Sequence, residues 1–205
     1  MEKFERLTGV AVPLMGENVN TDAIMPTAWI VNVADDWGAG LFGNWRRDLE
    51  GRERPDFLLN QPRYRESRIL LAGRNFGCGS SREEAVWGLV GFGIRCVIAP
   101  SFSDIFYDNA FKNGLLPVVL SDVDVTALAN ELAVAEPPTL TVDLVRCVVT
   151  APDSREFPFC LDNGRRADVL QGLDDIGRTL TQAATIDRFQ ATDRGRRPWV
   201  YTRAG

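Results

Sequence analysis

The stretch "RILLAGRNFGCGSSREEAVWGLVGFGIRCVIAP" (residues 68–100) holds two apolar runs separated by a glycine-rich turn and a helical pattern. The runs at 68–73 and 94–100 are short and rich in branched side chains, which is typical of buried strands. Between them, apolar residues recur at helical spacing, at Ala85, Val86, Leu89 and Val90. A strand, a helix and a second strand in this order predict a parallel pair joined by a crossover helix.

The next residues continue the alternation. Segment 101–114 has apolar residues at helical spacing and ends at Gly114, which favours a helix stop. Residues 115–120 form a third apolar run, and 121–133 predict another helix with Asp122 as its N-cap. The sequence therefore predicts an α/β fold in which a mainly parallel sheet core is flanked by helices.

The segments on either side follow another pattern. Residues 7–14 and 139–145 have the composition of strands, and 146–159 have that of a hairpin. We expect these strands to be antiparallel and barrel-like. Residues 34–66 are rich in Gly, Pro, Trp and Arg and show little periodicity. Long segments of this kind are usually functional or disordered.

Composition limits the class of protein. The chain has 205 residues, 45% of them hydrophobic, and a formal net charge of −5. This length suits one domain with a sizeable core, and the charge provides no basic field for nucleic acid. No apolar run approaches the ~20 residues of a membrane span, and the start lacks the apolar core of a signal peptide. We expect a cytoplasmic protein that binds neither nucleic acid nor membrane.

Cysteine and histidine usage narrows the chemistry. The four cysteines are widely spaced without a C-x-x-C pair, and there is no histidine. We therefore expect no disulfide framework, and no zinc or iron–sulfur site built from this chain alone. A triad or proton relay that uses imidazole is excluded within the chain. Any metal used in catalysis would have to come from a partner.

The serine loop, residues 75–82, is where we expect the chemistry. Two overlapping matches to the S-x-x-E capping box predict a helix start directly after a strand, Ser80 with Glu83 and Ser81 with Glu84. Free N–H groups at a helix start, together with the guanidinium of Arg82, suit a carboxylate or phosphate. A well-capped helix with a surface arginine fits the same residues. Both interpretations stay open on the residues alone.

Four motifs in sequence order resemble the small subunits of 3-isopropylmalate dehydratases, which belong to the aconitase superfamily. They are "NVNTDAIMP" (18–26), "NFGCGSSRE" (75–83), "IAPSFSDIFYDNAFKNGLLPV" (98–118) and "GLDDIGRTL" (172–180). The resemblance covers nearly the whole chain. It implies one swivelling β/β/α domain over residues 1–205, with a substrate-covering segment at about 27–66 and a C-terminal helical extension at about 165–205.

The resemblance also implies a division of labour between two chains. A large subunit would carry a [4Fe–4S] cluster, and this chain would bind no cofactor and no metal. The two would form a heterodimer or heterotetramer that is active only as a complex. The reaction is that of a hydro-lyase, which interconverts 2-isopropylmalate and 3-isopropylmalate by dehydration and rehydration in leucine biosynthesis. The substrate is a small hydroxy-dicarboxylate.

Within the serine loop, the family's G-S-S-R motif falls on residues 79–82. By this resemblance Ser80 would be the base that takes a proton from the substrate carbon. A serine hydroxyl is a very weak acid, so its alkoxide would need stabilisation by nearby N–H groups and a cation. The substrate itself would be bound by Gly79, Ser81 and Arg82.

The family's D-T-D motif falls on Asn20, Thr21 and Asp22. By resemblance, Asp22 would orient the serine and act with it in catalysis, while Thr21 would contact the substrate. The residues alone favour a different role for Asp22, as the side chain that closes an Asx-turn.

Two departures from the family pattern bear on the substrate. Glu84 stands where the family has a histidine, and residues 23–42, where the family carries lysine and arginine, have no basic residue. We expect this segment to cover the substrate with an apolar surface and an acidic side, formed by Ile24, Met25, Trp29, Ile30, Val31 and Val33, and by Asp35 and Asp36. A hydro-lyase acting on a methylated malate or citramalate, and a non-catalytic binding or regulatory domain, stay open as alternatives.

Overall fold

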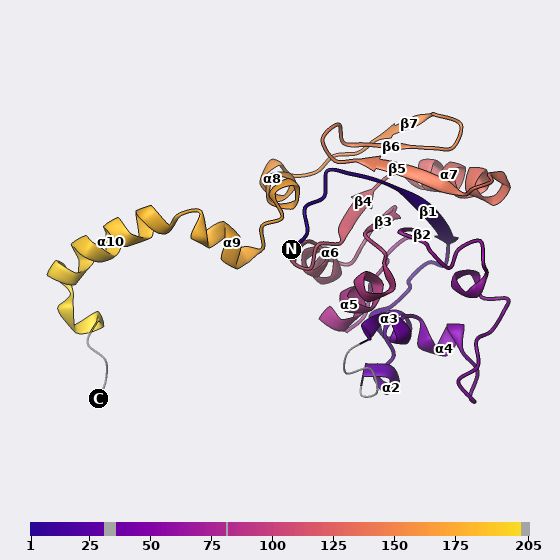
Figure 1. Cartoon of the computed structure of the whole chain (residues 1–205), viewed down its shortest axis with the longest axis horizontal. Coiled ribbons are helices and arrows are strands. Elements are labelled where there is room, and N and C mark those ends of the chain that lie inside the picture. Colours follow the sequence, from indigo (N-terminus) through magenta and orange to yellow (C-terminus); the bar gives the residue numbers. More distant parts are fainter. Residues whose placement is uncertain (31–35, 81, 202–205) are drawn as a thin grey trace.

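The computed structural model describes residues 1–30, 36–80 and 82–201. Its centre is a seven-stranded sheet in the order β4-β3-β2-β1-β5-β6-β7. Strand β1 (Arg6–Leu14) lies in the middle, parallel to β2 on one side and antiparallel to β5 on the other. Figure 1 shows the antiparallel strands at the top of the molecule and the parallel strands beneath them.

The parallel half of the sheet comes from the alternating segment of the sequence. Its other strands are β2 (Ile69–Ala72), β3 (Cys96–Ala99) and β4 (Leu116–Val119). All residues of β2 and β3 are buried, as expected for strands covered on both faces. The predicted α/β fold with a parallel core is confirmed, and the helices of this half are α5 (Glu83–Phe92), α6 (Asp104–Lys112) and α7 (Asp122–Val134).

The antiparallel half is formed by β5 (Thr139–Asp143), β6 (Val148–Thr150) and β7 (Glu156–Pro158). Residues of β5 alternate between buried and half-buried, the pattern of a strand with one covered face. Strands β6 and β7 pair antiparallel, so the predicted hairpin is confirmed.

Neighbouring residues of a strand face two separate hydrophobic clusters. On β2, Ile69 and Leu71 belong to the cluster that includes the buried residues of α7. Leu70 and Ala72 belong to the cluster that includes the buried residues of α5 and of the segment before β2. Side chains of a strand alternate between faces, so helices cover both faces of the parallel half.

The end of α6 and the start of α7 can be compared with the helix stop and the N-cap predicted from the sequence. Gly114 has a φ of +73° just after the C-cap of α6, which confirms the predicted stop. The N-cap of α7 is Ser121, not Asp122. Ser121 has an extended backbone and its hydroxyl accepts the N–H of Asp124 at 3.2 Å. Asp122 is the first helical residue, where its charge still favours the positive helix end.

The segment before β2 contains short helices in place of a structureless loop. Leu41, Phe42 and Leu59 are fully or almost fully buried, so much of this segment belongs to the core. The elements are α1 (Thr21–Ile24), α2 (Thr27–Ile30), α3 (Trp37–Gly40), α4 (Gly43–Arg46) and the 3-10 turn η1 (Leu58–Asn60).

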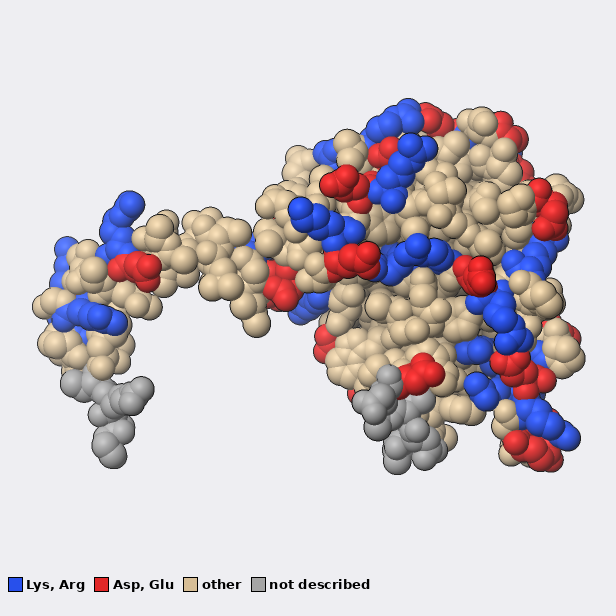
Figure 2. All heavy atoms as spheres, viewed as in Figure 1, with Lys and Arg blue, Asp and Glu red and all other residues tan. Residues whose placement is uncertain are grey.

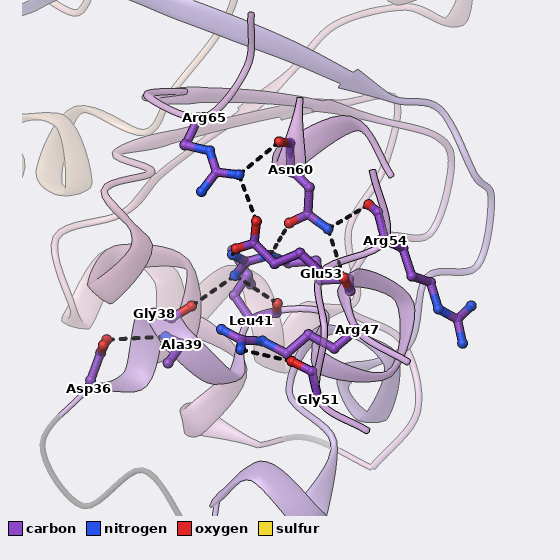
Figure 3. A network of polar contacts seen from close by, with 11 residues as sticks. Asp36, Gly38, Ala39, Leu41, Arg47, Gly51, Glu53, Arg54, Asn60 and Arg65 are labelled. Atoms are coloured by element: carbon purple, nitrogen blue, oxygen red, sulfur yellow. Dashed lines mark hydrogen bonds and ion pairs between the residues drawn. The ribbon is translucent and has the colours of Figure 1, made fainter. Parts of the chain in front are cut away.

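A buried arginine organises these short helices. Arg46 is 6% exposed, and its guanidinium donates to the carbonyl oxygens of Gly38 at 3.1 Å and Leu41 at 3.3 Å and to Asn60 Oδ1 at 3.2 Å. Asn60 in turn donates to the Arg46 carbonyl at 2.7 Å, within the network drawn in Figure 3. Burial lowers the pKa of Arg46. Arg46 is the first basic residue after Asp22 in the sequence. Because its N–H groups donate to backbone and side-chain oxygens of this segment, Arg46 stabilises the fold and does not replace the missing basic residues of 23–42.

The C-terminal part consists of α8 (Asn163–Gln171), α9 (Asp175–Leu180), α10 (Ala183–Arg196) and the turn η2 (Pro198–Val200). Figure 1 shows α9 and α10 extending away from the sheet and its helices. Apolar side chains are exposed along this arm, among them Ile176, Leu180, Phe189 and Trp199. Figure 2 shows basic and acidic side chains interspersed over the visible face. None of the described helices is both long and apolar enough to cross a membrane.

Candidate active site

Three segments meet at the carboxyl end of the parallel strands. The serine loop follows β2 and lies between the segments that follow β1 and β3. It is tied to the first by Gly77 N–H to the Val19 carbonyl at 2.8 Å. It is tied to the second by Phe76 N–H to the Ser101 carbonyl at 3.0 Å, and by Ser103 N–H to the Phe76 carbonyl at 3.0 Å. This edge is where parallel α/β sheets bind ligands.

Ser80 lies exposed in the serine loop. Its carbonyl accepts the hydroxyl hydrogen of the buried Thr21 at 2.5 Å, and Thr21 N–H donates to the Cys78 carbonyl at 2.9 Å. Gly77 and Gly79 have φ of +74° and +88°, values that favour glycine. The hydroxyl of Thr21 is therefore engaged with the chain and fixes the backbone of Ser80.

Arg82 is held by two side chains from the segment after β1. Its Nη2 lies 3.1 Å from Asp22 Oδ1, and its Nη1 donates to the Thr27 hydroxyl oxygen at 2.7 Å. The Arg82 side chain is 29% exposed and that of Asp22 54% exposed. A guanidinium has five N–H donors, so the two contacts orient the group and leave others for a bound anion. The predicted site residues Asp22 and Arg82 are thus in direct contact.

The predicted capping box at the start of α5 is wrong for Ser80 and Glu83. The N-cap of α5 is Arg82, and no side chain caps it. Ser80 lies in the loop before this helix, with its carbonyl bound by Thr21. Glu83 instead accepts a hydrogen bond at 2.9 Å from Asn113, the C-cap of α6. Ser81, the other predicted capping residue, lies outside the described residues.

The interpretation of Asp22 as an Asx-turn residue is also wrong. The residue that closes the turn is Asn20, whose Oδ1 accepts the N–H of Ala23 at 2.7 Å as the N-cap of α1. Asp22 lies in the first turn of α1, and its carboxylate is free to pair with Arg82.

The described cysteines are not arranged to hold a cluster. Cys96 is buried in β3, where burial raises the pKa of its thiol, and Cys160 is exposed far along the chain. Cys78 lies in the serine loop, and its thiol donates to the Asn18 carbonyl at 3.3 Å. Within residues 1–30, 36–80 and 82–201, no three Cys, His, Asp or Glu side chains are grouped to bind a metal. The residues present therefore do not fit an iron–sulfur cluster held by this chain.

The chain is also similar to known proteins. The family model of the aconitase C-terminal domain matches residues 1–123. A 3-isopropylmalate dehydratase small subunit of Dinoroseobacter shibae is 48% identical over 201 residues, which are 98% of this chain and 100% of the relative. The chain belongs to this family of small subunits. A small subunit of Paracoccus denitrificans is 49% identical over the same shares of both chains.

A crystal structure of a 3-isopropylmalate dehydratase of Methanocaldococcus jannaschii has the same fold. It matches with a TM-score of 0.63 and 24% identity, covering 88% of this chain and 99% of the other. The α/β fold with a parallel core and antiparallel flanking strands is therefore a fold found in this enzyme family.

In this small-subunit chain, the predicted apolar cover over the substrate is wrong for two of its residues. Ile24 and Met25 are fully buried in the core. A Cβ at Gly88 would lie 2.4 Å from the Met25 methyl group, and one at Gly40 would lie 2.8 Å from its sulfur. Asp36 is exposed and caps α3 through the N–H of Ala39 at 3.1 Å. Val31, Val33 and Asp35 lie outside the described residues.

One contact of the site was not predicted from the sequence. Thr27 follows Pro26 at the start of α2, and nothing in the local pattern distinguishes it from other threonines. Its contact with Arg82 joins residues separated by 55 positions. No local spacing in the sequence therefore signals this contact.

Proposed function

We propose that this chain is the small subunit of a 3-isopropylmalate dehydratase. With a large subunit it would interconvert 2-isopropylmalate and 3-isopropylmalate by removing and re-adding water, in leucine biosynthesis in the cytoplasm. The observation that carries the proposal is the pairing of Arg82 with Asp22 beside the exposed Ser80, at the carboxyl edge of the parallel strands. The similarity to small subunits over 98% of the chain supports it.

In this proposal Ser80 is the base. Dehydration requires that a proton leave a carbon next to a carboxylate, and Ser80 as alkoxide would accept that proton and return it on rehydration. The bond from Thr21 to the Ser80 carbonyl fixes the backbone that carries the hydroxyl. A positioned base of this kind contributes typically about 10²–10⁴-fold to the rate.

Arg82 would bind a substrate carboxylate through its remaining N–H groups. Asp22 would act in catalysis through Arg82, because the Asp22 carboxylate pairs with that guanidinium at 3.1 Å. Gly79 and Ser81 complete the proposed substrate contacts. The exposed Gly79, with its φ of +88°, leaves backbone atoms open to a ligand.

The large subunit would hold the [4Fe–4S] cluster, which supplies the Lewis acid for the hydroxyl that leaves the substrate. This chain would bind no cofactor and would close over the partner's site in a heterodimer or heterotetramer.

This division of labour predicts that the purified chain alone has no dehydratase activity. Anaerobic addition of a cluster-loaded large subunit should produce turnover of 3-isopropylmalate that saturates with the amount of the chain. The measurement is absorbance of the unsaturated intermediate or product, with each chain alone as control. Turnover by this chain without partner and metal would exclude the proposal.

A further inference from the structure

The Thr27–Arg82 hydrogen bond places a neutral side chain in the proposed anion site. Arg82 Nη1 donates to the Thr27 hydroxyl oxygen at 2.7 Å, while Nη2 faces Asp22. Each contact restrains a different nitrogen of the guanidinium, so together they fix the plane of the fork. A planar fork binds a carboxylate through two N–H groups only when its plane matches that of the carboxylate.

The two partners differ in what they do to the charge. Asp22 holds Arg82 but also cancels part of its positive charge, which weakens the attraction for a second carboxylate. Thr27 holds Arg82 without bringing a charge. Residues 23–42 contain no lysine or arginine, so binding of a carboxylate by this chain depends on the charge and orientation of Arg82. The hydrogen bond to Thr27 orients Arg82 without weakening its attraction for that carboxylate.

The Thr27 hydroxyl also has a hydrogen to donate. A hydroxyl has one donor and two acceptor positions, and here the oxygen is used as an acceptor. Among the described residues, no acceptor lies in hydrogen-bond geometry with the Thr27 hydroxyl. Accepting from a cation strengthens a hydroxyl as a donor, because chained hydrogen bonds polarise one another. Thr27 is exposed, so its hydrogen can reach a ligand bound to Arg82.

The core fixes where Thr27 stands. Met25, two residues earlier, is fully buried against Gly40 and Gly88, and Ile24 is fully buried beside it. These contacts tie the end of α1 to α3 and α5, so the segment that leads into α2 is anchored in the core, while α2 itself has no buried residue. Thr27, which contacts Arg82, is exposed and lies two residues after the buried Met25.

We propose that Thr27 is a positioning residue that orients the Arg82 guanidinium and donates its own hydroxyl hydrogen to the carboxylate bound there. It thereby lowers KM for a dicarboxylate in a site whose 23–42 segment has no lysine or arginine. The expected effect on KM rests on the proposed function, whereas the Thr27–Arg82 contact does not.

The test compares Thr27→Val, which keeps the shape and loses the hydroxyl, with Thr27→Ser, which keeps the hydroxyl. With the large subunit in excess, Thr27→Val should raise KM for 3-isopropylmalate about 10-fold, or about 1.4 kcal/mol, with kcat changed less than about 2-fold, as expected for lost uniform binding. Thr27→Ser should stay within about 3-fold of the unchanged chain. Thr8→Val, whose hydroxyl pairs with Thr141 at 2.8 Å in the antiparallel half, is the control.

A second readout needs no partner and no turnover. In ¹⁵N NMR spectra of the isolated full chain, the Nη signals of Arg82, assigned by their loss in Arg82→Lys, should be resolved at low temperature. The Nη signals should merge in Thr27→Val, because loss of the hydroxyl lets the guanidinium rotate more freely. They should stay resolved in Thr27→Ser, which keeps the hydroxyl. Unchanged Nη signals in Thr27→Val, or equal KM increases in both variants, would overturn the proposal. If the unchanged complex fails to turn over 3-isopropylmalate, the proposed function fails, and the NMR comparison still decides the role of Thr27.

Discussion

Replacing Ser80 by alanine should lower kcat of the reconstituted complex by about 10²–10⁴-fold, the typical contribution of a positioned base. The folded state should lose almost nothing. Ser80 is exposed, it does not cap α5, and the bond from Thr21 goes to its backbone carbonyl, which alanine keeps. Surface changes of this kind usually alter stability by less than about 0.5 kcal/mol. The measurements are kcat, thermal unfolding, and affinity for the large subunit.

The matched control for this change is Ser154→Ala, an exposed serine in the turn between β6 and β7. It should leave kcat and partner affinity unchanged. Retention of more than about a tenth of kcat by Ser80→Ala, a loss below ~1.4 kcal/mol, would show that Ser80 is not the base.

Gly77→Ala should lower the free energy of unfolding by about 2–5 kcal/mol. Gly77 has a φ of +74°, and an added Cβ there would lie 2.2 Å from the Phe106 ring carbon Cγ. The left-handed conformation costs an alanine about 1–2 kcal/mol, and overpacking a core costs about 1–3 kcal/mol. Phe106 cannot move aside easily, because it is 1% exposed and packed between Phe76 and Phe102.

The control for Gly77→Ala is Gly51→Ala, which separates the two costs. Gly51 has a similar φ of +79°, but an added Cβ would meet nothing within 4 Å. It should therefore lose only the conformational part, about 1–2 kcal/mol. Chemical denaturation of the isolated chain measures both changes, and equal losses would show that Phe106 does not resist the added methyl group. Gly77→Ala should also reduce kcat, because the loop that it distorts carries Ser80.

The strands of the parallel half could be predicted because their signal is local. Residues 69–72 and 96–99 are short apolar runs bounded by turn residues, and burial on both faces requires that composition. The order of strands and helices then restricts the topology to a parallel sheet with crossover helices. The meeting of residues 18–27 with the serine loop follows from that topology, since parallel strands end at the same edge.

The helix starts and the buried loop could not be predicted in the same way. The capping box at Ser80 is wrong because α5 begins only at Glu83 with Arg82 as its N-cap, so Ser80 lies two residues before the cap. Met25 looked like part of a cover because it is apolar, but the glycines that make room for it are Gly40 and Gly88, distant in sequence. The Thr27–Arg82 contact is likewise tertiary, and no local spacing encodes it.

The most direct test of the central claim is the preference of the reconstituted enzyme among hydroxy-dicarboxylates. With the cluster-loaded large subunit in excess, kcat/KM is measured for 2-isopropylmalate, 3-isopropylmalate, citramalate and malate. We predict the highest values for the two isopropylmalates, and a kcat about 10²–10⁴-fold lower for every substrate that is turned over when Ser80→Ala replaces the unchanged chain. Turnover of citramalate or malate without measurable turnover of either isopropylmalate would contradict it.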